Sequence, residues 1–115
     1  LYTSSASLGT TTTAYTTSNE VSGSGYTAAG KALTNTGVAK STVTSYTDFS
    51  DVSWTSASFT ARGCLIYNSS SISGLTANAA VAVIDFGGDK TVSSGTFTIQ
   101  FPTNDSSDAI IRITS

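Results

Sequence analysis

Residues 95–101 (GTFTIQF) alternate strictly between apolar and polar side chains, and this alternation constrains the fold more than any other feature of the chain. Phe97, Ile99 and Phe101 fall on one side of an extended backbone, because successive side chains of a β-strand point to opposite faces. Such a segment is typical of a strand with one face in the core and the other in solvent. Pro102 lacks an N–H donor, so we expect the strand to end there.

Other segments also predict strands. Residues 58–67 (SFTARGCLIY) are apolar on both faces at their C-terminal end, so we expect that end to lie centrally in a sheet. Residues 79–86 (AAVAVIDF) form an unbroken apolar run that stops at Gly87-Gly88, which predicts a strand buried on both faces and then a hairpin turn. Weaker strand signals cover residues 13–17, 41–47 and 109–114.

The composition supports an ordered β protein. The 115 residues include 21 threonines and 21 serines but only one proline, whereas mucin-like stalks are rich in proline. Threonine is β-branched and therefore favours strands over helices. We predict an all-β fold, a single-domain β-sandwich of jelly-roll type over residues 19–115, with an extended N-terminal arm over residues 1–18; a small barrel is the alternative. The expected core contains Phe49, Trp54, Phe59, Leu65, Tyr67, Val81, Val83, Phe97, Ile99, Phe101 and Ile111.

The charges exclude several classes of function. Only 10% of the residues are charged and the formal net charge is −2, so five scattered cations cannot form a phosphate-binding stripe. The scattered cations give no reason to expect nucleic acid as a partner. No apolar run approaches about 18 residues, so we expect no membrane as a partner either. Histidine, the commonest general base, is absent, and the single Cys64 cannot form an internal disulfide. We therefore expect no catalytic residue, no cofactor and no metal, and we expect Cys64 to be a buried apolar side chain.

Asp85 lies inside the most hydrophobic predicted strand, where a buried carboxylate needs a partner. We prefer an interpretation in which Asp85 lies at a strand end and pairs with Arg62, Lys90 or backbone N–H groups, because no spacing here matches a calcium-binding loop. The alternative is a calcium site that combines Asp85 and Asp89 with Asp48 or Asp51. A small glycosidase would likewise need two of these carboxylates on opposite sides of a cleft.

Four tyrosines lie in polar, glycine-rich surroundings and are candidates for an interface. Tyrosine is favoured at protein interfaces because it combines a large apolar area with a polar tip. Alternatively, these side chains anchor loops at the rim of the core. Together with two residues of the loop over residues 19–33, the predicted interface set is Tyr2, Tyr15, Asn19, Glu20, Tyr26 and Tyr46.

Four blocks of the chain resemble a group of small structural proteins encoded by tailed bacteriophages. They are AYTTSNEVSGSGYTAAGKAL (14–33), DFSDVSWTSASFTARGCLIY (48–67), AVAVIDFGGDKTVSSGTFTIQFP (80–102) and IIRI (110–113). The resemblance implies a virion structural protein, and in particular a cement (decoration) protein that binds the outer capsid surface. Its expected partners are the major capsid protein and further copies of itself, for example in a trimer. A receptor-binding or adhesive module of a head fibre or tail is the alternative.

Overall fold

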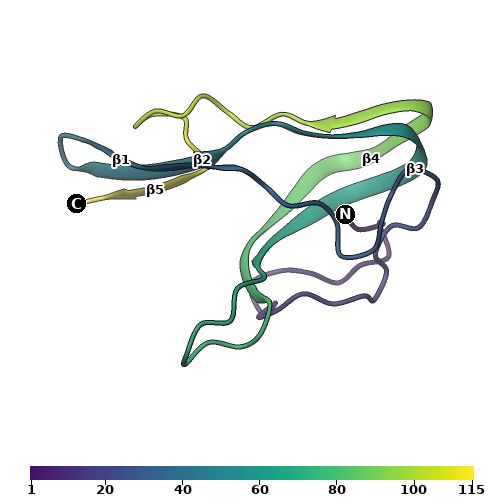
Figure 1. Cartoon of the computed structure of the whole chain (residues 1–115), viewed down its shortest axis with the longest axis horizontal. Helices are drawn as coiled ribbons and strands as arrows, with labels where there is room; N and C mark the ends of the chain where they lie inside the picture. The colour runs from purple at the N-terminus through teal and green to yellow at the C-terminus, as the bar shows by residue number, and fades with distance from the viewer. The chain divides into compact units, whose positions relative to one another are not determined.

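The computed structural model describes residues Leu1–Ser115 and is built from strands without a helix (Figure 1). The strands are β1 (Asn35–Ser41), β2 (Thr44–Phe49), β3 (Val52–Asn68), β4 (Ala79–Ile99) and β5 (Ile111–Thr114). They form a three-stranded sheet in the order β1-β2-β5 and a two-stranded sheet of β3 and β4. The predicted all-β class is therefore confirmed. The structure has no helix long and apolar enough to cross a membrane.

The chain divides into two compact units. Unit 1 contains Leu1–Gly30 and Thr55–Thr96, and unit 2 contains Lys31–Trp54 and Phe97–Ser115. The long strands β3 and β4 contribute residues to both units, whereas β1, β2 and β5 belong to unit 2. Residues 1–18, the expected arm, are part of unit 1.

In unit 2, β2 pairs antiparallel with both β1 and β5. Ser41 pairs with Thr44, so Thr42 and Val43 form a two-residue turn between β1 and β2. The prediction of one strand over residues 41–47 is wrong, because this turn interrupts the segment. The polar strand β1 has only weak strand character of its own, and its pairing with β2 supplies the order that its sequence does not indicate.

The buried positions of β3 change parity along the strand. Val52 and Trp54 are buried near its start, and Ala57 and Phe59 are buried further along. Ser56, between these pairs, has a φ of 50°. A residue in the left-handed region of an extended strand is typical of a β-bulge, which shifts the alternation by one residue and keeps apolar side chains on the covered face. The predicted strand over residues 58–67 is confirmed within β3.

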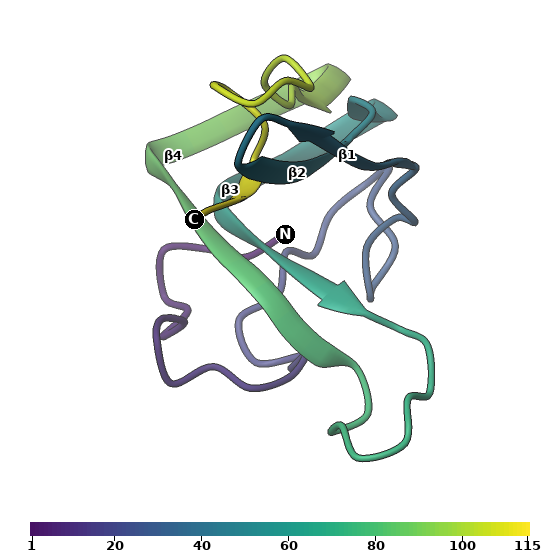
Figure 2. The same cartoon turned by 90° about the vertical axis from the view of Figure 1, so that its left-hand side faces the viewer.

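Strand β4 differs from both predictions made for its sequence. It continues through Gly87-Gly88, so the predicted hairpin turn is wrong; Gly87 has a φ of 76° inside the strand, and the alternation of exposed and half-buried residues runs unchanged from Val81 to Asp89. The first half of β4 alternates between half-buried and exposed residues, so burial on both faces is also wrong. β4 pairs with β3 in a two-stranded sheet (Figure 2), and the physical reason for the exposure of Val81 and Val83 is that no second layer covers the side of the sheet on which they lie.

The core of the structure agrees with part of the expected list. Trp54, Phe59 and Leu65 are buried as predicted, whereas Val81 and Val83 are exposed. The other expected core side chains are half-buried: Phe49, Tyr67, Phe97, Ile99, Phe101 and Ile111. In unit 2, the rings of Trp54 and Phe97 form one aromatic pair, and those of Phe49 and Phe101 form another. Leu1, Tyr2 and Val21 are buried in unit 1, and the sequence pattern did not indicate them.

Candidate functional site

The structure brings three of the predicted interface residues together in unit 1, around the carboxylate of Glu20. One carboxylate oxygen, Oε2, accepts a hydrogen bond from the Tyr15 hydroxyl at 2.7 Å. The other, Oε1, accepts from the Tyr26 hydroxyl and from the Ala29 backbone N–H, both at 2.8 Å. Three donors from separate parts of the N-terminal segment therefore converge on one acidic group, and charge-assisted bonds of this kind are stronger than neutral ones.

The contacts with Glu20 change the acidity of the tyrosines. The hydrogen bond to Glu20 is the main cause that raises the pKa of Tyr15 to about 12. Burial is the main cause that raises the pKa of Tyr26, and its hydrogen bond to Glu20 acts in the same direction. A hydroxyl that donates to a carboxylate loses that bond when it ionises, so both tyrosines stay protonated well above neutral pH.

Tyr2 does not lie at the surface. Its side chain is only 3% exposed, so the expectation of an exposed aromatic is wrong for this residue. The Tyr2 N–H donates to the Gly63 carbonyl at 2.9 Å, and the Arg62 N–H donates to the Tyr2 carbonyl at 2.7 Å. Tyr2 thus lies along the edge of β3 that β4 leaves open, and this backbone pairing is the physical reason for its burial. Its hydroxyl donates to the Thr16 carbonyl.

The remaining predicted interface residues have different surroundings. Asn19 is exposed with a φ of 59°, and its side-chain amide donates to the Ser5 carbonyl at 3.0 Å. Tyr46 lies in β2 of unit 2, where it is half-buried between Ala39 and Arg112 on the neighbouring strands. The set of six is therefore not one patch, and its role in binding stays a prediction.

Tyr67 of β3, which was expected only in the core, joins the tyrosine cluster of unit 1. Its ring stacks on Tyr15 at a centroid distance of 4.9 Å and an interplanar angle of 26°. The Tyr67 hydroxyl donates to the Ala29 carbonyl at 2.8 Å, and the N–H of the same residue, Ala29, donates to Glu20. These contacts fasten the glycine-rich loop to β3, so the tyrosines of this cluster hold loops in place.

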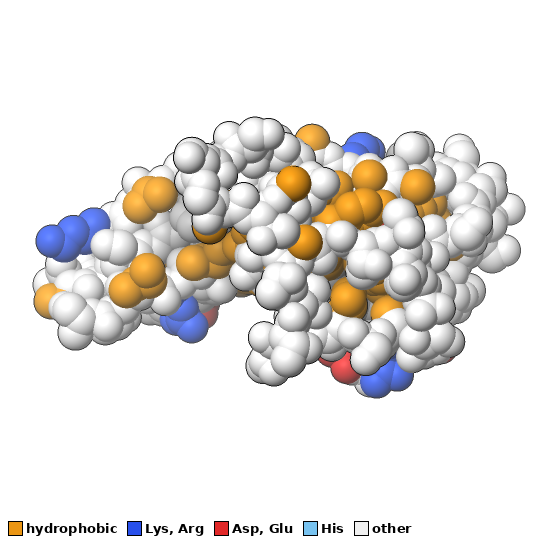
Figure 3. Space-filling view, turned by 90° about the horizontal axis from the view of Figure 1, so that it is seen from below, with side chains coloured by type: hydrophobic (Ala, Val, Ile, Leu, Met, Phe, Trp, Pro, Cys, Tyr) orange, Lys and Arg blue, Asp and Glu red, His pale blue; other side chains and the backbone are white.

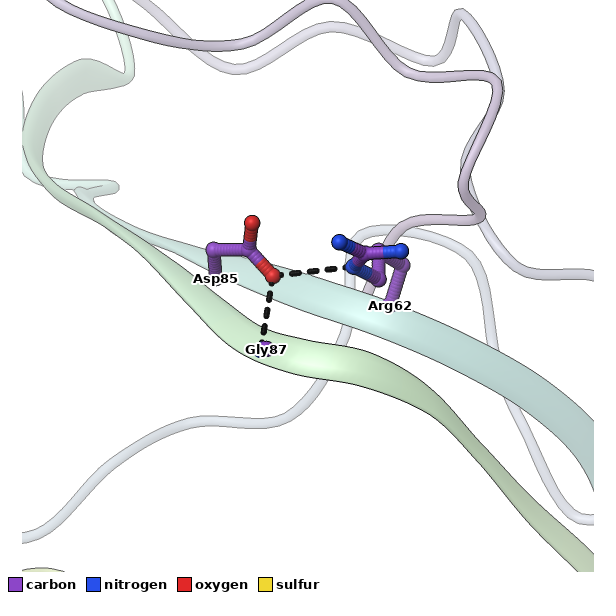
Figure 4. A network of polar contacts seen from close by, with 3 residues as sticks. All are labelled: Arg62, Asp85 and Gly87. Carbon is purple, nitrogen blue, oxygen red and sulfur yellow. Dashed lines mark hydrogen bonds and ion pairs between the residues drawn. The ribbon is translucent and has the colours of Figure 1, made fainter.

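Asp85 is paired as expected but is not buried. Its Oδ1 accepts hydrogen bonds from Arg62 Nε at 2.9 Å and from the Gly87 N–H at 2.8 Å (Figure 4). The bond from Arg62, followed by that from Gly87, lowers the pKa of Asp85. The side chains of Arg62 and Asp85 are 40% and 66% exposed, and Asp85 occupies an outward position of β4. The interpretation that Asp85 pairs with Arg62 and a backbone N–H is confirmed. Its expected burial is wrong, and so is its expected position at a strand end, because β4 continues beyond it to Ile99.

The other candidate carboxylates hold backbone segments of unit 2. Asp48 is fully buried, and it accepts from the Phe49 N–H at 2.8 Å and from the Ile110 N–H at 3.4 Å. Asp51 accepts from the Phe101 N–H at 2.8 Å. The structure has no group of three or more acidic or cysteine side chains that could bind a metal ion. The aspartates of the hypothetical calcium site are instead divided, two in each unit.

Cys64 lies buried in β3, with 7% of its surface exposed. Burial raises the pKa of its thiol to about 11, so almost none of it is the reactive thiolate at neutral pH. The prediction of a buried, apolar cysteine is confirmed.

Exposed apolar side chains form two surfaces that the sequence analysis missed. The first, here called the open sheet face, is one side of the β1-β2-β5 sheet. Val38 and Ile113 on this face are 81% and 73% exposed. The strand register places its six residues on the same side of the sheet: Val38, Lys40, Ser45, Thr47, Ile111 and Ile113. Apolar and basic side chains lie together at the surface in the left part of Figure 3.

The second surface, here called the outer β4 stripe, consists of Val81, Val83, Asp85 and Asp89, which all point outward from β4. The sequence gives little signal for it, because AVAVIDF is apolar at every position except Asp85, and such a run does not show which face is covered. No protein-family model, no curated protein and no solved structure significantly matches the chain.

Proposed function

We propose that this chain is a non-enzymatic virion structural protein of a tailed bacteriophage. In this proposal it is a capsid cement (decoration) protein that stabilises the head by binding the outer surface of the major capsid protein, as a homo-oligomer. The observation that carries the proposal is the pair of exposed apolar surfaces on a small all-β chain, the open sheet face and the outer β4 stripe. Large apolar side chains at the surface of a strand favour association with another protein.

The contacts of the acidic groups support a role without catalysis. Glu20 is surrounded by three donors, Asp48 and Asp51 accept backbone N–H groups, and Asp85 bonds Arg62. A glycosidase needs one carboxyl group to act as the acid and a second to act as the base or nucleophile. Here the same groups are used to hold loops and strands in place.

The adhesive alternative receives less support, because it depended on exposed tyrosines. Tyr2 is buried, and Tyr15 and Tyr26 use their hydroxyls to bind Glu20. The finer arrangement as a β-sandwich of jelly-roll type belongs to the same proposal, and the presence of two separate sheets supports it.

The proposal is tested with heads of the phage that encodes the chain, prepared without this protein. The purified chain is added, and binding is measured by co-sedimentation while head stability is followed by thermal release of DNA. We expect saturable binding and a higher release temperature. A glycan array and a cell-binding assay test the adhesive alternative in parallel. Heads that neither bind the chain nor gain stability from it would refute the cement role.

A further inference from the structure

The open sheet face has only positive charge. Its strands contain three side chains that carry a formal charge at neutral pH, Lys40, Arg112 and the fully buried Asp48. Lys40 shares the face with Val38, two residues before it, and with Ile113, which lies in the same cross-strand row. The face is therefore an apolar patch beside a basic group. Removal of apolar side chains such as Val38 and Ile113 from water is favourable, so this patch gains free energy when another surface covers it.

The outer β4 stripe carries a net negative charge, because its two carboxylates, Asp85 and Asp89, outnumber the one cation beside them, Arg62 of β3, which pairs with Asp85. Val81 and Val83 are 50% and 37% exposed, and Asp85 and Asp89 continue the same outward row. The only contacts of the Asp85 carboxylate, with Arg62 and Gly87, both use Oδ1. By alternation Lys90 falls on the other face of β4. The stripe is thus an apolar patch that continues into acidic groups.

The two surfaces match in spacing as well as in charge. On β1, the basic Lys40 lies two residues after the exposed Val38. On β4, the acidic Asp85 lies two residues after the exposed Val83. Two residues of a strand span about 6.6–6.8 Å, so valine can meet valine while lysine meets aspartate. Two copies of the open sheet face would instead oppose lysine to lysine, which is unfavourable.

We infer that copies of this chain associate head to tail, with the open sheet face of one copy on the outer β4 stripe of the next. In a contact between two different surfaces, each copy binds one neighbour through the first surface and another neighbour through the second. Such contacts form closed rings, or open chains with one unoccupied surface at each end. No capsid protein takes part in this contact, so its test is independent of the test of the cement role.

The test is a complementation experiment with the full chain, followed by sedimentation velocity at several concentrations and two salt concentrations. Val38→Asp blocks the open sheet face, and Val81→Lys blocks the outer β4 stripe. Leu75→Lys is the matched control, since Leu75 is a 58% exposed residue of unit 1 outside both surfaces. Because the substituted side chains are at least half exposed, we expect all three variants to fold, which circular dichroism checks.

We expect the wild type and Leu75→Lys to form species heavier than 11.7 kDa, more weakly at high salt. Each blocked variant alone should associate at least about tenfold more weakly, since each substitution places a charge in the apolar part of one of the two surfaces. An equimolar mixture of the two should form a one-to-one dimer that grows no further, because each variant keeps one intact surface. A monomeric wild type at every concentration, blocked variants that associate like the wild type, or a mixture that stays monomeric would overturn the inference.

Discussion

Gly63 of β3 lies where three backbone segments meet, and substitution by alanine tests how closely they approach. A Cβ atom at Gly63 would lie 2.5 Å from the Ile84 carbonyl oxygen of β4, whereas ordinary contact begins at 3.4 Å. The Ile84 backbone would therefore have to retreat by about 0.9 Å. Overpacking of this kind costs about 1–3 kcal/mol. Strain on the adjacent pairing with Tyr2 adds about 1 kcal/mol per weakened hydrogen bond.

We expect Gly63→Ala to lower the free energy of unfolding by about 2–4 kcal/mol, a large part of the total for a small protein. Urea denaturation followed by far-ultraviolet circular dichroism measures this loss. Gly88→Ala in β4 is the control, because a Cβ atom at Gly88 would have no neighbouring atom within 4 Å and the φ of Gly88 is not positive. A loss below about 0.5 kcal/mol, or one equal to that of Gly88→Ala, would refute the close approach of β3 and β4 at this point.

Three further predictions concern single groups. Thr42→Gly should stabilise the chain by about 1 kcal/mol in urea denaturation, because Thr42 has a φ of 51° and precedes Val43 in a turn that favours glycine; a destabilised variant would contradict this. Glu20→Gln should bring the pKa of Tyr15 down from about 12 toward 10 in a tyrosinate absorbance titration. Because this pKa is raised in the folded state, its contribution to stability is complete below pH 10 and is lost as the pH rises through about 12; an unchanged Tyr15 titration in the variant would count against the contact. The Cys64 thiol should react with a disulfide reagent on the order of a hundredfold more slowly in the native protein than in denaturant, and equal rates would show that it is not buried.

The strands that the sequence predicted correctly are those whose own side chains alternate or are strongly apolar. Residues 58–67 lie within β3, and residues 95–99 of the strand predicted over 95–101 lie within β4, which ends at Ile99, before Pro102. Strand β1 was missed because it contains only two apolar residues, one of them 81% exposed, and forms by pairing with β2. The continuity of β4 through Gly87-Gly88 was missed because glycine adopts a positive φ equally well in a turn and, as Gly87 does, inside a strand.

The candidate site shows a similar division. The pairing of Asp85 with Arg62 could be predicted, because a carboxylate in an apolar strand needs a partner and few cations exist. The convergence of Tyr15, Tyr26 and Ala29 on Glu20 could not, because these donors come from separate turns of an irregular segment. No periodicity relates positions in such a segment, so only the path of the backbone brings them together.

The amino-acid sequence by itself determined the all-β class, the burial of Cys64 and the acidic, histidine-free chemistry, because each depends on local side-chain properties. The tertiary structure decided which faces of the strands are covered. Val81 and Val83 belong to the most apolar segment of the chain, yet they face outward because burial needs a second layer, and the covering of a face depends on the path of distant segments.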